Sequence, residues 1–198
     1  MTSLSGIDVD TASGDRAWRA REKLRDRGDE LLAELAAKVA LVTELQLSVT
    51  LHEEAHDELA RFCRRQVLGL LTATDRVLYA AAAEANDTRL LVRALRTQHD
   101  LLAAEIEDLV RANTIGRAAL AGHAILALLD GCRRVEQAVL LPAMAAIPGV
   151  DLAGLVDDLD AVLRDGLFRD ARAPELPVSE GSPPAPGGYA RLASGQAG

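Results

Sequence analysis

The chain has 198 residues, which is enough for one domain with a substantial hydrophobic core. Hydrophobic residues make up 49% of the chain and aromatic residues 3%. Because strong helix formers such as Ala, Leu, Arg and Glu dominate, the composition favours an all-α protein over a sheet. The net charge of −8 argues against a general nucleic-acid binder, whose affinity would rest on neutralising phosphates.

The sequence also bears on compartment and redox chemistry. No uncharged apolar stretch is long enough to predict a membrane span, and no basic segment followed by an apolar core marks a signal peptide. Two cysteines, Cys63 and Cys132, are too few for a disulfide framework. We expect them in the core, with a redox pair as an alternative. A cytoplasmic protein with no nucleic-acid or membrane partner is therefore predicted.

Apolar periodicity predicts four long helices and a shorter fifth, flanked by two disordered ends. The predicted helices span residues 13–47, 50–84, 87–112, 117–146 and 151–166. Residues 1–12 are small and polar, and residues 171–198 contain five of the seven prolines, so both segments are expected to be disordered. Short connections imply antiparallel neighbours, which predicts an up-down four-helix bundle over residues 13–170.

The first predicted helix carries an apolar stripe and a basic run. The stripe predicts one buried face and allows a homodimer through this helix. It consists of Leu24, Leu31, Leu35, Val39, Val42 and Leu45. Acidic residues interrupt the basic run, which is more typical of a solvated face than of a binding patch. The run consists of Arg16, Arg19, Arg21, Lys23, Arg25 and Arg27.

The second predicted helix opens on His52-Glu53-Glu54-Ala55-His56, which matches the His-Glu-x-x-His motif of zinc hydrolases. Asp57 and Glu58 follow directly, where such enzymes usually have an uncharged and then an apolar residue. The motif also lies in a predicted first turn, which a Thr50-x-x-Glu53 capping box would open. A zinc hydrolase is therefore a minor alternative, and two partly exposed histidines are the favoured interpretation.

Polar residues interrupt the apolar stripes of the third and fourth predicted helices. His99 follows the heptad steps of Leu95 and Leu102, while Cys132 and Glu136 share one face with Ile125, Leu129 and Val139. An unpaired buried carboxylate is costly, so Glu136 needs a metal ion, an inward arginine or a proton. His99 and Glu136 together make a metal site a serious alternative to a hydrogen-bonded core.

Three segments, at residues 67–79, 99–102 and 135–142, resemble the hemerythrin-like family. That family usually has a His-x-x-x-Glu pair before Leu-Tyr in its second helix and a lone His in its third. A second His-x-x-x-Glu pair precedes Leu-Leu-Pro in its fourth helix. The resemblance covers about residues 50–165, and it implies a hemerythrin-like up-down bundle around a metal site.

Carried over to this chain, His99 matches the third-helix ligand and Glu136 matches the fourth-helix carboxylate. Cys132 stands where the family has His, while Leu70 and Thr74 replace the second-helix His and Glu. A five-histidine di-iron site is impossible, because the chain contains only four histidines.

The resemblance leaves two functions open. The favoured one is a bundle with an eroded metal site, acting as a non-catalytic binding or regulatory protein for an unknown protein or small molecule. The alternative is a remodelled non-haem iron site for oxygen, nitric oxide or redox sensing. Its metal ligands would be His99 and Glu136 with Cys132, Asp75 or His56, and a thiolate would favour zinc or iron.

Overall fold

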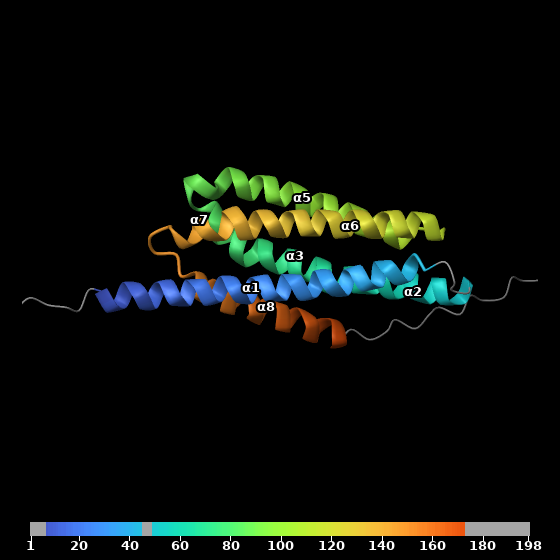
Figure 1. The fold of residues 1–198 in the computed structure, drawn as a ribbon, viewed down its shortest axis with the longest axis horizontal. Helices are drawn as coiled ribbons and strands as arrows, with labels where there is room; N and C mark the ends of the chain where they lie inside the picture. The colour runs from blue at the N-terminus through green and yellow to red at the C-terminus, as the bar shows by residue number, and fades with distance from the viewer. Residues whose placement is uncertain (1–6, 45–48, 173–198) are drawn as a thin grey trace, which may run out of the picture.

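The computed structural model describes residues 7–44 and 49–172 as an elongated stack of helices (Figure 1). Every element within these two ranges is helical, and neither range contains a strand. The all-α prediction is therefore confirmed for the part of the chain that the structure describes. Disorder was predicted for residues 1–12 and 171–198, of which 1–6 and 173–198 lie outside the described residues, whereas 7–12 and 171–172 are helical.

Five helical runs make up the part of the chain that the structure describes. The first is α1 (Ile7–Val42), the third is α5 (Asn86–Arg111) and the last is α8 (Leu152–Arg172). The second and fourth are continuous helices that contain short π-helical turns, labelled η. The second run comprises α2 (Val49–Phe62), η1 (Cys63–Val67), α3 (Leu68–Thr74), η2 (Asp75–Tyr79) and α4 (Ala80–Ala83), and the fourth comprises α6 (Ile115–Val135), η3 (Glu136–Leu140) and α7 (Leu141–Ala145).

Several predicted helix ends differ from the structure. α1 begins at Ile7 rather than at residue 13. α8 continues through Gly166 to Arg172 instead of stopping at the glycine. A glycine ends a helix only where the chain leaves in a left-handed turn, and at Gly166 the chain continues as a helix.

The helix starts also show which N-terminal caps form. α2 already begins at Val49, so Thr50 lies inside the helix rather than at its cap. Ala85 precedes α5 without a side-chain cap, and Asp87 lies in the first turn instead. Thr114 caps α6, because its side-chain oxygen accepts a hydrogen bond from the Arg117 backbone N–H over 3.3 Å.

The helices pack around two apolar clusters that follow each other along the long axis. α6 contacts both α5 and α1, while α8 lies against α1 and α3. One cluster centres on Leu35, Leu59 and Ile106, and the other on Leu95, Met144 and Leu159. Four members of the predicted α1 stripe, Leu24 among them, are buried within the chain. A homodimer through α1 stays a prediction and would have to use other α1 side chains.

Part of the basic run on α1 holds α8 in place. Lys23 forms ion pairs with Asp157 over 3.4 Å and with Asp160 over 2.5 Å, and Arg27 pairs with the same Asp160. These pairs raise the pKa of Lys23 and hold the pKa of Asp160 below its usual range. The predicted solvated face is therefore only partly solvated, because Lys23 and Arg27 form ion pairs with carboxylates of α8.

The π-helical turn η3 corrects the predicted stripe of the fourth helix. Ile125, Leu129, Cys132 and Glu136 are buried as predicted, whereas Val139 is 50% exposed. A π-helical turn inserts one extra residue per turn and rotates everything that follows. Leu140 is therefore fully buried where ordinary helical spacing placed Val139.

The run Ile115–Ala145 is, among the described residues, the one helix long and apolar enough to cross a membrane by length and composition. A core helix of a soluble bundle passes the same test, and this run packs between α1 and α5. The predicted lack of a membrane partner stays a prediction.

Candidate functional site

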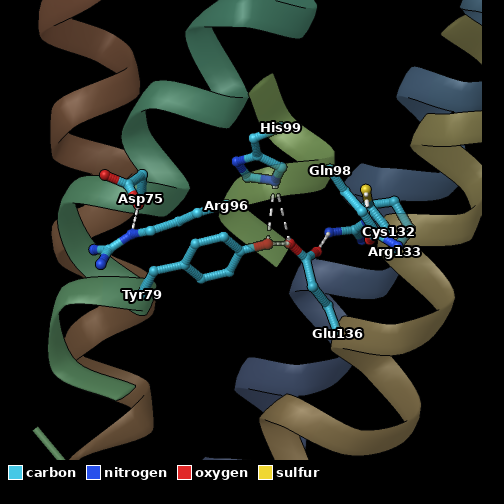
Figure 2. A network of polar contacts seen from close by, with 8 residues as sticks. All are labelled: Asp75, Tyr79, Arg96, Gln98, His99, Cys132, Arg133 and Glu136. Atoms are coloured by element: carbon cyan, nitrogen blue, oxygen red, sulfur yellow. Dashed lines mark hydrogen bonds and ion pairs between the residues drawn. The ribbon is translucent and has the colours of Figure 1, made fainter. Parts of the chain in front are cut away.

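A polar layer separates the two apolar clusters, and four side chains from three helical runs build it. Tyr79 comes from η2, His99 from α5, Arg133 from the last turn of α6 and Glu136 from η3. In Figure 2 the phenol of Tyr79 and the imidazole of His99 both point at the Glu136 carboxylate. Two of the four lie in π-helical turns, which often mark functional positions.

The four side chains form one chain of hydrogen bonds. The Tyr79 hydroxyl donates to Glu136 Oε1 and lies 3.1 Å from His99 Nε2. Because that hydroxyl has one proton, His99 Nε2 must carry a hydrogen and donate to the Tyr79 oxygen. The rings of Tyr79 and His99 also stack, with centroids 5.0 Å apart. His99 is thereby fixed as one tautomer that faces the carboxylate.

Arg133 provides the positive charge next to Glu136. Its Nη1 lies 3.4 Å from Glu136 Oε2, and its Nη2 donates to the Leu24 carbonyl of α1. The side chains of Arg133 and Glu136 are only 13% and 8% exposed, so water screens this pair weakly. Of the three explanations for a buried Glu136 that the sequence left open, the structure contains the inward arginine.

The buried environment shifts the acid–base behaviour of the layer. Burial raises the pKa of Glu136, and the hydrogen bond from Tyr79 and the charge of Arg133 oppose that rise. Burial also lowers the pKa of His99 to about 4, so its imidazole is neutral at pH 7. The pKa of Tyr79 is raised by burial and by the neighbouring Glu136. The layer therefore holds a neutral imidazole, a phenol and a buried carboxyl group next to a guanidinium.

Cys132 lies one helical turn before Glu136 but has a different partner. Its thiol donates to Gln98 Oε1 over 3.3 Å, and burial raises its pKa to about 11. It is therefore a protonated thiol at neutral pH, in a hydrogen bond with α5. Cys63 is also free and fully buried, and burial raises its pKa to about 12. Both cysteines are core residues, as predicted.

Asp75 and His56 do not join His99 and Glu136. Asp75 binds Arg96 Nε over 2.6 Å, on the other side of the Tyr79 ring from Glu136 (Figure 2). His56 Nε2 lies 2.7 Å from the Leu109 carbonyl. Leu109 is ten residues beyond His99 in α5, which is about 15 Å along a helix axis. Two of the five predicted ligands are therefore held elsewhere.

The His-Glu-x-x-His motif lies in the first turns of α2, next to the start of α6. His52 Nε2 and His56 Nε2 each lie 2.7 Å from a backbone carbonyl, of Glu44 and of Leu109 respectively. His52 is 8% exposed, so the prediction that it is partly exposed was wrong. Since different backbone carbonyls hold the two rings, the motif does not present two Nε2 atoms to one metal.

A metal ion does not fit the polar layer as these residues stand. No group of three or more His, Cys, Asp or Glu side chains gathers closely enough to hold one, within the residues described. His99 Nε2 and Glu136 Oε1 are 4.0 Å apart with the Tyr79 hydroxyl bonded to both, and a guanidinium is already next to the carboxylate. A cation there would meet the charge of Arg133 at close range.

Leu70 marks a further departure from the family pattern. It stands at the position of the second-helix His, but its side chain lines a groove between α1, α3 and α8. Thr74, at the position of the Glu, is buried and offers a hydroxyl instead of a carboxylate. The second helical run therefore contributes Tyr79 to the layer, a residue that the sequence analysis did not single out.

Comparison with known proteins assigns no relative: no family model matches the chain, and neither a curated protein nor a solved structure matches it.

Proposed function

We propose that this chain is a metal-independent bundle of the hemerythrin-like type that acts as a non-catalytic binding or regulatory protein. In this proposal the four long helical runs form the up-down bundle of that family, and α8 is an added fifth helix. One observation carries the proposal: Glu136, which matches the family's fourth-helix carboxylate ligand, lies 3.4 Å from the Arg133 guanidinium and accepts a hydrogen bond from the Tyr79 hydroxyl. A guanidinium thus supplies the positive charge that a metal would supply.

The geometry also supports a non-catalytic role. The polar layer is buried between two apolar clusters, and each of its members already has a partner inside the protein. A general base must reach a substrate proton directly or through one water, and a carboxylate with both oxygens engaged is poorly placed for that. The layer is better suited to fixing the register of the helices than to chemistry.

Metal analysis tests the proposal directly. The untagged protein is incubated with iron(II) without oxygen, or with zinc, then dialysed and analysed by mass spectrometry of the elements. Substoichiometric metal is expected. Stoichiometric iron that is lost in His99→Ala and Glu136→Gln would instead support the non-haem iron alternative. Zinc lost only in His52→Ala or His56→Ala would support the hydrolase.

A gain-of-metal variant tests the family assignment separately. Arg133→Met removes the internal cation, and Cys132→His restores the family's residue one turn before Glu136. The double variant is expected to bind iron or zinc and to melt at a higher temperature with metal than without it. Arg134→Met combined with Cys132→His keeps the internal cation and is the matched control. If the first double variant gains no metal, the hemerythrin-type arrangement is contradicted.

A further inference from the structure

The groove between α1, α3 and α8 concentrates arginines around an apolar floor. Its volume is about 650 Å³, which lies in the range of small-molecule sites. We propose that this groove binds an amphipathic anion, a ligand with one carboxylate, sulfate or phosphate head group on an apolar chain. This proposal adds a ligand class to the binding role proposed above. Only its biological meaning rests on that proposed function. Of the polar layer, neither Tyr79, His99, Arg133 nor Glu136 lines the groove.

One wall of the groove is a helix surface with small side chains between two arginines. Arg65, Gly69, Thr72 and Arg76 line it, and they come from η1, α3 and η2 of one continuous helical run. Arg76 lies eleven positions after Arg65, or about 16 Å along a helix axis. Gly69 and Thr72 keep the wall low between them, and a Cβ at Gly69 would have no atom within 4 Å. An elongated ligand has room along this wall, between the two arginines.

The floor of the groove comes from three helical runs and is apolar. Leu31 of α1, Leu70 of α3 and Leu163 of α8 line it, together with Leu68, Ala73 and Val162. Leu70 and Ala73 are almost fully buried, whereas Leu31 and Leu163 are half-buried and remain accessible from the groove. An apolar chain laid on this floor would remove that remaining surface from water, which favours binding.

The charges around the rim favour a negatively charged ligand. Five arginines and three carboxylates line the groove, although the whole chain has a net charge of −8. Arg27 pairs with Asp160, and Arg64 pairs with Glu107 over 3.6 Å. The other three arginines have no ion-pair partner among the described residues, and guanidinium groups favour carboxylate and phosphate oxygens. These three are Arg65, Arg76 and Arg164.

The three carboxylates on the same rim, of Glu30, Glu34 and Asp165, limit the ligand further. A polyanion such as a nucleic acid would meet their charge as well as that of the arginines, and its affinity would depend on many phosphate contacts. A single head group can pair with an arginine and place its chain on the floor without approaching all three acids. The mixture of arginines and carboxylates on the rim therefore favours a small amphipathic anion over a polyanion.

Isothermal titration calorimetry tests the proposal with dodecanoate as the probe, below the concentration at which it forms micelles. Saturable one-to-one binding is expected for dodecanoate but not for dodecyltrimethylammonium, which has the same chain and the opposite charge. The double variant Arg65→Glu with Arg76→Glu is expected to bind at least about tenfold more weakly, because charge-assisted hydrogen bonds are lost. Arg117→Glu, an exposed change at the start of α6, is the matched control and should bind normally.

Filling the groove provides a second, charge-independent test. Gly69→Leu places a side chain in open space and favours the helix, so the variant should fold, which circular dichroism checks. It is expected to abolish dodecanoate binding.

Three results would overturn the proposal: equal binding of the cationic probe, equal weakening in Arg117→Glu, or binding only to phosphatidylglycerol vesicles and not to free dodecanoate. None of them depends on metal content, so this test can fail while the proposed function stands.

Discussion

The guanidinium of Arg133 occupies the space in which any side chain at position 28 would lie. Gly28 is buried within α1, and a Cβ built on it would overlap the Arg133 side chain. The absent side chain lets the arginine reach across α1 to the Leu24 carbonyl while it stays next to Glu136. The glycine at position 28 is therefore explained by contact with a neighbouring helix and not by the conformation of its own backbone.

Gly28→Ala is expected to destabilise the protein, although alanine alone would favour a helix by about 1 kcal/mol. The methyl group displaces Arg133 and removes the cation next to a buried carboxylate. Loss of one partner of a buried pair costs on the order of 3 kcal/mol, so a net loss of about 2 kcal/mol follows. Urea unfolding followed by circular dichroism measures it.

Gly131→Ala is the matched control for that change. A Cβ at Gly131, two residues before Arg133 in α6, would have no atom within 4 Å, so this variant should be as stable as the wild type or more so. In a Glu136→Gln background the cost of Gly28→Ala should shrink, because no buried charge is left uncompensated. A stabilising Gly28→Ala would contradict the placement of Arg133.

Arg133→Met is expected to destabilise the protein by about 3 kcal/mol at pH 7, because Glu136 then loses its charge partner. Burial already raises the pKa of Glu136, and removing the arginine raises it further. The carboxyl then protonates more readily, so the loss should become smaller as the pH falls from 7 to 5. Urea unfolding at both pH values measures this trend.

Arg134→Met serves as the control for Arg133→Met. Arg134 pairs with Asp130 over 2.8 Å, and its side chain is 79% exposed. Surface pairs of this kind contribute about 0–1 kcal/mol, so its loss should be small and should not depend on pH in the same way. Equal losses in the two variants would show that Arg133 acts as an ordinary surface arginine.

The helical class and most of the core could be predicted from sequence, because apolar spacing reports burial directly. Leu95, Leu102 and Ile106 on one face of α5 are buried as predicted. The prediction failed at Val139, since it assumed ordinary helical spacing and η3 adds a residue. No local signal distinguishes a π-helical turn from an α-helix at that point, because the choice depends on packing between helices.

The polar layer was only half predictable. His99 and Glu136 stood out because each interrupts an apolar stripe, and the structure places them 4.0 Å apart. Tyr79 and Arg133 were missed because a tyrosine fits an apolar stripe and an arginine usually marks a solvated face. Their roles depend on contacts between helices far apart in sequence, and the glycine at position 28 was the one available signal for Arg133.

His99 should make the folded state sensitive to mild acid. Its pKa is lowered from 6.5 to about 4 by burial, so the unfolded chain binds a proton between these values and the folded chain does not. Stability is therefore present above pH 6.5 and is lost as the pH falls toward 4. Between pH 7 and pH 5 this loss is on the order of 2 kcal/mol.

His99→Gln separates that contribution from the other titrating groups, because it keeps a side chain that can donate to Tyr79 but does not titrate. The variant should lose about 2 kcal/mol less than the wild type between pH 7 and pH 5 in urea unfolding. Raising the pH again should restore the stability of the wild type. Parallel pH profiles for the two proteins would show that His99 titrates normally and is not desolvated.

Tyr79→Phe removes one hydroxyl from the centre of the layer. The His99 N–H then loses its acceptor and Glu136 Oε1 loses its donor, and unsatisfied buried groups cost about 1–3 kcal/mol. The ring and its packing stay, so the loss in urea unfolding reports the hydroxyl alone. Thr97→Ala removes an exposed hydroxyl that donates to the Arg93 carbonyl over 3.2 Å, and it should change stability by no more than about 0.5 kcal/mol. If Tyr79→Phe were equally harmless, His99 and Glu136 would have to hydrogen-bond to each other or to water without the Tyr79 hydroxyl. The layer would then be a set of independent side chains.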